Sequence, residues 1–122
     1  MDWKIDNNKP IYLQLLEQIK LKIISGEIPI GSKLDSVRSL AQEAEVNPNT
    51  MQKALSELER EDLVYSKRTS GRFVTDNKDK IYNMREEIAS EEINSLKEKL
   101  INLGYDEKEI IKLIKHSLEG EL

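Results

Sequence analysis

Cysteine is absent from this chain of 122 residues, and histidine occurs only once, as His116. A chain without cysteine has no disulfide, no zinc-thiolate site and no thiol nucleophile. His116 has no second histidine or cysteine with which to share a metal ion. We therefore expect no bound metal, no cofactor and a cytoplasmic location.

Long apolar runs are missing as well. No stretch approaches the roughly 18 residues that a membrane-spanning helix needs, and the first residues, MDWKID, lack the apolar core of a secretory leader. Paired acid-base or metal-binding residues are not found beyond surface-type charged runs at 91–92 and 107–109. The sequence predicts a soluble protein that does not contact a membrane and is not an enzyme.

Positive charge is scarce overall but locally concentrated. Residues 1–76 carry 11 Lys and Arg against 12 Asp and Glu, and residues 77–122 carry 8 against 11, so the formal net charges are -1 and -3. Between residues 64 and 75 the only charged side chains are Lys67, Arg68 and Arg72. This balance disfavours a protein that coats nucleic acid non-specifically, but a local basic patch is sufficient for site-specific binding.

A helix is predicted to begin at Asn47 and Pro48 and to end near Asp62. Asparagine is a favoured N-cap, and proline fits the first helical position. At about 100° per residue, one face holds amides, hydroxyls and cations without a carboxylate: Asn49, Gln52, Lys53, Ser56 and Arg60. The opposite face is apolar: Met51, Ala54, Leu55 and Leu58. A solvated face and a ligand-binding face both fit this pattern, so the neighbouring segments must decide.

A first helix and a turn are predicted earlier in the chain. Pro10 and Gly26 bound the helix, whose apolar residues recur every four positions: Ile11, Leu15, Ile19 and Ile23. Proline and glycine then enforce a turn over residues 28–34, where Lys33 and Leu34 add at most a short strand.

A second, short helix is predicted over residues 36–45. Its first turn holds Arg38, although the positive end of the helix dipole disfavours a cation there. A nearby anion explains this position, and so does an ion pair with Asp35 or Glu43.

A β-hairpin is predicted after the third helix. Residues 63–66 and 72–75 alternate apolar and polar side chains around Thr69, Ser70 and Gly71, which places Lys67, Arg68 and Arg72 at or near its tip. Exposed edges also carry such cations to prevent aggregation. However, three helices followed by a basic hairpin is the order of a winged helix. In that fold the third helix enters the major groove and the hairpin contacts the backbone or a minor groove.

Several segments resemble a known family. They are PIYLQL at 10–15, ISG at 24–26, GSKL at 31–34, SVRSLA at 36–41, VNPNT at 46–50 and GRFV at 71–74. Over about residues 9–75 the chain resembles the DNA-binding domain of GntR-type bacterial transcription regulators, and its NPNT form and short tail resemble the YtrA-type branch. The resemblance implies these DNA contacts: Ser36, Arg38, Asn47, Asn49, Thr50, Gln52, Ser70, Gly71 and Arg72. The polar face and the basic hairpin add Lys53, Lys67 and Arg68.

Three positions depart from the family pattern. Asp35 replaces a proline, and it either caps the second helix or weakens DNA binding by its charge. Pro48 replaces an arginine or serine, which removes one DNA contact but is usual in the YtrA-type branch. Asp62 replaces a glycine where a left-handed backbone is expected, a conformation that aspartate tolerates at some cost.

The C-terminal segment is predicted to form two amphipathic helices. One spans about residues 78–103 and stops at Gly104, and the other is capped by Asp106 with Glu109. Two such helices cannot bury both apolar faces on each other, so we expect a partner surface, most simply the same tail of a second subunit. The alternative is that they fold back on the winged helix. The expected dimer contacts are Ile88, Ile93, Leu96, Leu100, Leu103, Ile110, Ile111, Ile114 and Leu118.

The sequence thus predicts a mostly α-helical chain with a small β-hairpin. Residues 1–76 form an N-terminal winged helix-turn-helix domain that binds DNA, and residues 77–122 form a two-helix dimerisation tail. A dimer would bind double-stranded DNA at a palindromic operator and act as a repressor. By family resemblance, its targets include its own operon and adjacent transporter genes. The alternative function is a winged-helix protein-interaction module that does not bind DNA.

A small-molecule effector is not expected. The tail leaves little room for the roughly 300 Å³ of a ligand pocket, although a ligand between the tail helices of a dimer stays open as an alternative.

Overall fold

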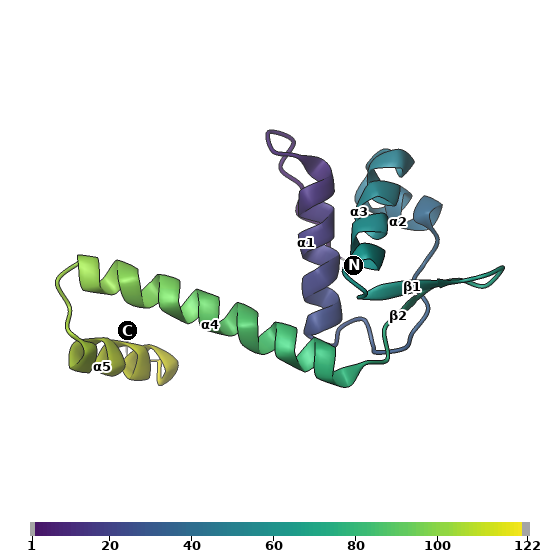
Figure 1. The fold of residues 1–122 in the computed structure, drawn as a ribbon. Helices are drawn as coiled ribbons and strands as arrows, with labels where there is room; N and C mark the ends of the chain where they lie inside the picture. Colours follow the sequence, from purple (N-terminus) through teal and green to yellow (C-terminus); the bar gives the residue numbers. More distant parts are fainter. Residues whose placement is uncertain (1, 121–122) are drawn as a thin grey trace. The chain divides into compact units, whose positions relative to one another are not determined.

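The computed structural model describes residues 2–120, which form five helices and one two-stranded sheet. The elements are α1 (Ile11–Ile24), α2 (Val37–Ala44), α3 (Pro48–Arg60), β1 (Val64–Lys67), β2 (Gly71–Val74), α4 (Lys78–Asn102) and α5 (Glu107–Leu118) (Figure 1). The chain divides into two compact units, of which the first ends at Arg85 and the second begins at Glu86. The predicted order of three helices, a hairpin and two further helices is confirmed.

The first unit has one hydrophobic core, and α3 lies at its centre. Helix α3 packs against both α1 and α2 and then leads into β1. Its apolar face is completely buried, as the periodicity predicted: Met51, Ala54, Leu55 and Leu58. Each buried side chain of leucine size contributes about 1.5–3 kcal/mol relative to an exposed one. The opposite, polar face of α3 is therefore held outward by the core.

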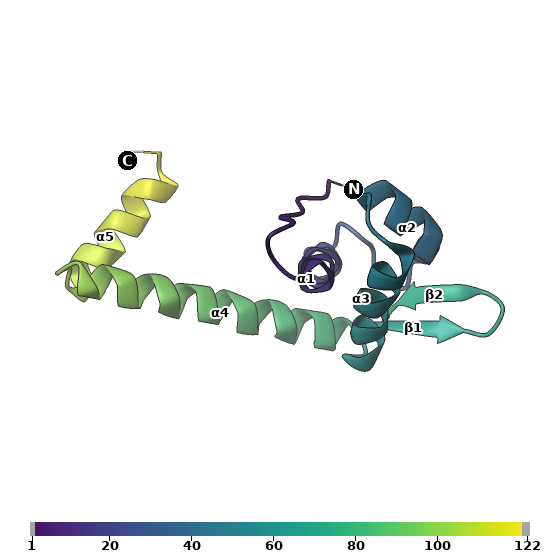
Figure 2. The same ribbon diagram turned by 90° about the horizontal axis from the view of Figure 1, so that it is seen from above.

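The strands β1 and β2 form an antiparallel hairpin, which we call the wing. Val64 pairs with Val74 at its base, and Lys67 pairs with Gly71 at its tip. Figure 2 shows the wing extending away from α1 and α3. Lys33 forms a single bridge to Phe73 on the outer edge of β2, with Leu34 N–H donating to the Arg72 carbonyl at 2.9 Å. The segment before α2 is thus attached to the wing.

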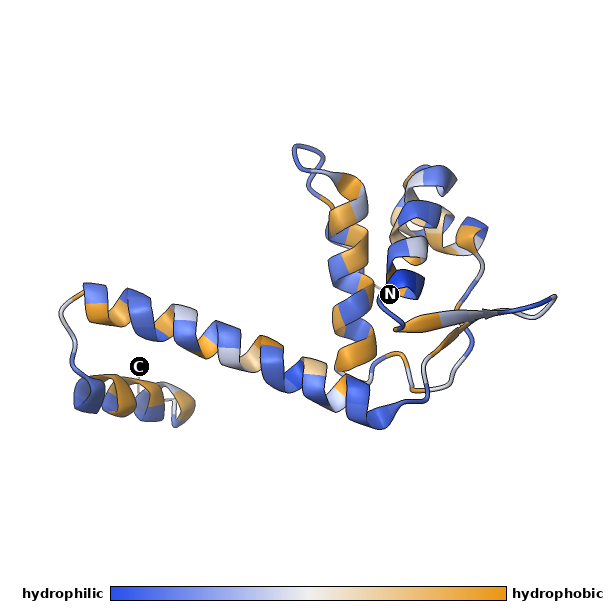
Figure 3. Ribbon diagram, in the orientation of Figure 1, coloured by the Kyte–Doolittle hydropathy of each residue, from blue (hydrophilic) through white to orange (hydrophobic). Residues whose placement is uncertain are grey.

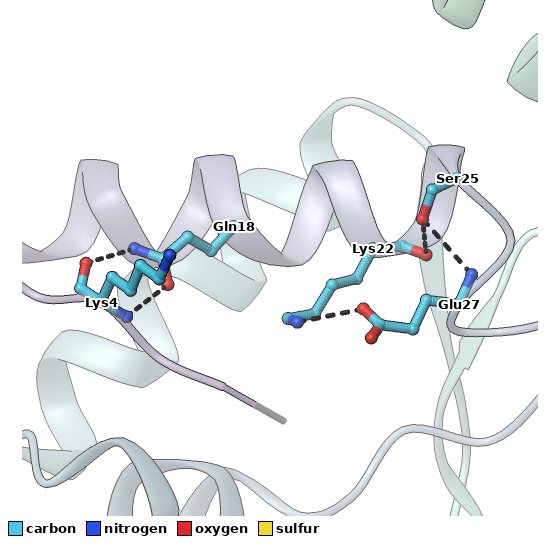
Figure 4. Close-up of polar contacts among 5 residues, drawn as sticks. All are labelled: Lys4, Gln18, Lys22, Ser25 and Glu27. Atoms are coloured by element: carbon cyan, nitrogen blue, oxygen red, sulfur yellow. Dashed lines mark hydrogen bonds and ion pairs between the residues drawn. The ribbon is translucent and has the colours of Figure 1, made fainter. Parts of the chain in front are cut away.

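An N-terminal arm is fastened to α1 by two glutamines. The Gln18 carboxamide accepts from the Lys4 N–H at 3.1 Å and donates to the Lys4 carbonyl at 2.7 Å (Figure 4). Gln14 repeats this exchange with Asp6, with both bonds at 2.7 Å. These side chains supply the hydrogen-bond partners for backbone N–H and C=O groups that a neighbouring strand would otherwise provide to an extended segment. The arm also places Trp3 against the core.

The first unit includes the beginning of α4. Ile81 is buried in the same core as α1 and α3, and Met84 packs against that core. The Arg85 guanidinium donates to the Ile24 carbonyl at the end of α1, with Nη2 at 2.6 Å and Nε at 3.1 Å. The first compact unit therefore includes the start of α4 and extends to Arg85.

The second unit contains the rest of α4 together with α5. Asp106 accepts from the Glu109 N–H at 2.9 Å, and Glu109 accepts from the Asp106 N–H at 3.1 Å, so the predicted cap at the start of α5 is a complete capping box. Figure 3 shows an apolar strip along one side of α5. Ile110 is buried, and Lys97 on α4 lies 3.8 Å from Glu107 on α5.

Candidate nucleic-acid interface

The N-terminus of α3 is fixed by Asn47 and Pro48. The Asn47 side chain accepts from the Asn49 N–H at 2.8 Å, and Pro48 occupies the first helical turn. Asn47, Pro48 and Asn49 are all exposed. Because the capping hydrogen bond uses the Asn47 side-chain oxygen, Oδ1, the Asn47 side-chain NH₂ group is left for a ligand. Within the described part of the chain, the Asn49 side chain has no hydrogen-bond partner.

The polar face of α3 is exposed along its first two turns. Gln52 donates to Ser56 at 3.3 Å, one turn further along. The Lys53 ammonium lies 3.8 Å from the centre of the Tyr12 ring, so α1 supports this cation through a cation–π contact. Thr50 is half-buried at the edge of the face. The face therefore presents carboxamides and a cation whose side chains are partly held in place.

The C-terminal end of this polar face carries a cation that is paired with a carboxylate. The Arg60 guanidinium is paired with Glu57 at 3.1 Å, one turn earlier on the same helix. This pair is exposed, and such pairs contribute little to stability. It nevertheless neutralises Arg60, so the unpaired polar groups are concentrated near the N-terminus of α3.

Helix α2 carries two further predicted residues. Ser36 is its N-cap and accepts from the Ser39 N–H at 3.1 Å, so Ser36 rather than Asp35 caps the helix. Arg38 is exposed in the first turn and forms no ion pair with any residue from 2 to 120. The ion pairs with Asp35 or Glu43 that would explain its position are not formed. A cation without a partner at a helix N-terminus favours an external anion.

The wing tip exposes a second group of cations. Lys67, Arg68, Ser70 and Gly71 are all exposed, and the turn needs positive φ values of 68° at Thr69 and 104° at Gly71. The Lys67 ammonium lies 4.5 Å from the centre of the Phe73 ring. None of the ion pairs within residues 2–120 involves Lys67 or Arg68. The tip is therefore a positive surface without a neutralising carboxylate.

Arg72 differs from the other predicted contacts. Its Nε lies 2.6 Å from Glu59 Oε1 on α3, and its side chain is only 18% exposed. Ser66, which pairs with Arg72 across the hairpin, donates its hydroxyl to the same Glu59 oxygen at 2.5 Å. The hydrogen bond from Ser66, together with the hydrogen bond and the positive charge of Arg72, holds the pKa of Glu59 below its ordinary value, against the opposing effect of partial burial. Arg72 is thus directed at α3, whereas the sequence had placed its charge with the tip cations.

Lys33 belongs to this surface although the sequence did not single it out as a contact. Its Cε lies 3.1 Å from the point where a Cβ on Gly71 would stand, so its side chain lies along the wing next to the tip. A groove separates the start of α2 from the wing, and its lining includes Lys33, Asp35, Ser36, Lys67, Ser70 and Gly71. In the sequence, the only local signal that Lys33 lies beside the wing was the short strand expected at residues 33–34.

The predicted dimer contacts lie on α4 and α5. Ile110 is buried, and Ile88 and Leu100 are half-buried. The others are exposed: Ile93, Leu96, Leu103, Ile111, Ile114 and Leu118. Within the second unit an apolar groove is lined by Ile93, Lys97, Glu107, Ile110, Ile111 and Ile114. Soluble monomers rarely leave so many large apolar side chains together in water.

The structure also bears on metal binding and on membrane insertion. The described residues contain no group of three His, Cys, Asp or Glu side chains that is arranged to hold a metal ion. No helix within residues 2–120 has the length and apolar character to cross a membrane.

Comparisons with known proteins agree on one family. Residues 11–74 match the model of the bacterial regulatory proteins of the gntR family. The chain is 33% identical over 120 residues to the uncharacterized HTH-type transcriptional regulator YhcF of Bacillus subtilis, covering 98% of this chain and 99% of YhcF. It is 41% identical over 71 residues to the HTH-type transcriptional repressor YtrA of the same organism, covering 58% of this chain and 55% of YtrA.

Solved structures give the same result. A GntR family transcriptional regulator from Listeria monocytogenes has a TM-score of 0.84 and 36% identity, and the match covers 91% of this chain and 97% of that one. The DNA-binding domain of AraR in complex with operator ORE1 has a TM-score of 0.52 and 28% identity, and covers 62% of this chain and 94% of that one.

Proposed function

The chain belongs to the GntR family of bacterial regulatory proteins, which are DNA-binding transcription regulators and not enzymes, and from this we propose that it is a dimeric repressor that recognises its operator through α3. The observation that carries the proposal is the exposed polar face on the N-terminal half of α3. Its exposed Asn49, Gln52 and Lys53 side chains form a face without a carboxylate, and the core holds that face outward.

The proposed contacts divide into two chemical classes. Asn49 and Gln52 carry carboxamides, which form paired hydrogen bonds with an adenine edge in the major groove. Asn47, Thr50 and Lys53 flank them on the same helix. The remaining contacts suit phosphates, because they are cations, hydroxyls and exposed backbone: Ser36, Arg38, Lys67, Arg68, Ser70 and Gly71. Base contacts then confer sequence preference, and phosphate contacts confer position and salt dependence.

A phosphate beside α2 explains the position of Arg38. Ser36 caps the helix, and Arg38 projects from its first turn without an ion-pair partner among the described residues. The helix N-terminus and this cation favour the same anion. The tip cations of the wing supply a second point of attachment to the backbone. Together these groups compensate locally for the net charge of -4 of the whole chain.

We further propose that two chains associate through α4 and α5. Ile111 is 67% exposed and Leu118 is 84% exposed, although both belong to the apolar face of an amphipathic helix. A second copy that covers this face gives a closed twofold dimer. Two α3 helices related by that axis would read a palindromic operator with half-sites about one helical turn apart, or a multiple of it. We propose that this repressor acts in the cytoplasm and that the genes it regulates include its own operon and adjacent transporter genes.

The test measures binding of the full chain to DNA from upstream of its own operon by fluorescence anisotropy at several salt concentrations. Arg38→Ala should weaken binding to every sequence and lower the salt slope by about one unit. Asn49→Ala should cost about 1–3 kcal/mol on the preferred sequence and little on a scrambled duplex. Equal, salt-independent binding by wild type and Arg38→Ala would exclude a phosphate contact at this residue.

A further inference from the structure

Arg72 and Glu59 form a contact between the wing and α3 that neutralises both charges. The guanidinium Nε lies 2.6 Å from Glu59 Oε1, and the arginine side chain is 18% exposed against 32% for the glutamate. An arginine that is already paired with a carboxylate displaces few counterions when DNA approaches. Arg72 therefore fits poorly as a phosphate contact, although its place on the wing suggested one.

The same carboxylate holds both strands of the wing. Ser66 on β1 and Arg72 on β2 face each other in the hairpin register, and both donate to Glu59 Oε1. A two-stranded hairpin has little stability of its own. Anchoring both strands to one residue of α3 fixes the direction of the wing relative to the helix that reads DNA.

Lys33 supplies an exposed cation where Arg72 does not. Its backbone bridges Phe73 at the edge of β2. Its side chain lies along the wing, with Nζ 3.9 Å from the point where a Gly71 Cβ would stand. Gly71 leaves the space that this lysine occupies, because any larger residue there would contact Lys33 Cε at 3.1 Å. Lys33 forms no ion pair within residues 2–120.

We propose that Lys33 contacts a DNA phosphate beside the wing, and that Arg72 is a positioning residue that fixes the wing to α3 through Glu59. The inference rests on the proposed DNA binding and assigns roles within it. Lys33 thus joins Lys67 and Arg68 in a phosphate-binding surface built from two separate chain segments. The contact of Arg72 with DNA that the sequence implied is replaced by a contact within the protein.

The first test compares Lys33→Gln with wild type on a duplex selected for tight binding. The logarithm of the binding constant is plotted against the logarithm of salt concentration, and the loss of one phosphate contact lowers the slope by about one unit. Lys33→Gln should show this loss together with a several-fold lower affinity. Lys78→Gln is the matched control, because Lys78 is an exposed lysine at the start of α4 in the same unit. An unchanged slope for Lys33→Gln would overturn the assignment of Lys33.

The second test exchanges the charges of the pair. Glu59→Arg and Arg72→Glu should each weaken binding at least several-fold, because each leaves two like charges in contact. The double exchange should restore affinity to near the wild-type value, since the contact between wing and α3 is rebuilt. If the double exchange binds no better than Arg72→Glu alone, Arg72 contacts DNA directly and the proposal fails.

An uncharged pair of side chains provides a second test if the charge-exchanged variants misfold. Glu59→Gln combined with Arg72→Gln keeps the pair neutral and should retain the wild-type salt slope, whereas a slope lower by about one unit would mean that Arg72 itself binds a phosphate. Circular dichroism verifies that every variant is folded. If folded wild type binds no duplex at all, the proposed function itself has failed, and that outcome is distinct from an unchanged slope in Lys33→Gln.

Discussion

Glu59 shows how one side chain can determine the geometry of a binding surface. Its carboxylate accepts from Ser66 and Arg72 on the two strands of the wing, while its backbone belongs to α3. The donated hydrogen bonds favour the ionised form, and this lowers the pKa of Glu59 below the ordinary value. The stability of the wing attachment is therefore linked to the protonation of this residue.

The linkage predicts a pH dependence of folding. Because the pKa of Glu59 is lowered in the folded state, its contribution is fully present above the unfolded value near 4.5 and is lost as the pH falls through the lower, folded value. The free energy of unfolding, measured by urea titration between pH 3 and 7, should fall more steeply below about pH 4.5 for wild type than for Glu59→Gln. Parallel pH profiles for the two proteins would contradict the linkage.

The ends of α3 are encoded as closely as its faces. Asn47 begins the helix, and Asp62, with φ at 60°, follows its last turn in the left-handed conformation. The family pattern predicted a left-handed residue at this position, and the structure confirms it. A residue with a side chain is strained there, although aspartate tolerates the conformation better than most.

Asp62→Gly should consequently stabilise the first unit. Glycine adopts a positive φ without steric cost, and we expect a gain of about 0.5–1 kcal/mol in the free energy of unfolding. The measurement is urea unfolding at pH 7. Asp76→Gly serves as the control, because Asp76 is exposed and has no positive φ. A loss of stability in Asp62→Gly would mean that the aspartate side chain has a role in the fold that outweighs its strain.

Local rules predicted the elements, whereas contacts between elements required the structure. The cap at Asn47, the four apolar positions of α3 and the capping box at Asp106 each depend on residues within a few positions of one another. The Arg72 partner lies on a different element, and Lys33 bridges a residue forty positions later in the chain. Sequence periodicity specifies which face a residue occupies but not which distant side chain it meets. The predicted position of Arg72 on the hairpin was therefore sound, while its partner was not predictable.

At the scale of the whole molecule, the first unit holds the surface proposed to bind DNA and the second unit holds the unpartnered apolar surface. Leu96 on α4 is 46% exposed and Leu103 is 73% exposed. Covering such residues with a second chain removes apolar area from water, which drives association. The sequence predicted the two helices correctly. The partner of those faces remains a proposal.

The dimer proposal predicts a specific effect of Leu96→Glu. In a twofold dimer the substitution acts twice, so losing the burial of two leucines should cost about 3 kcal/mol or more and raise the dimer dissociation constant more than about 100-fold. Sedimentation equilibrium measures this constant directly. Asn94→Glu is the matched control, because it adds the same charge at an exposed position on the other side of α4. Equal association by both variants, or a monomeric wild type at tens of micromolar, would contradict the proposal.

The most direct test of recognition by α3 is to select the duplexes that the full-length protein binds from a random pool and to sequence them. We predict enrichment of an inverted repeat with half-site centres separated by about 10–10.5 base pairs or a multiple of that distance. Gln52→Ala should change the base preferred at one position in each half-site and leave the spacing unchanged. Recognition through α3 would be contradicted if the folded protein enriched no sequence over the input pool. It would also be contradicted if wild type, Asn49→Ala and Gln52→Ala all enriched the same sequence.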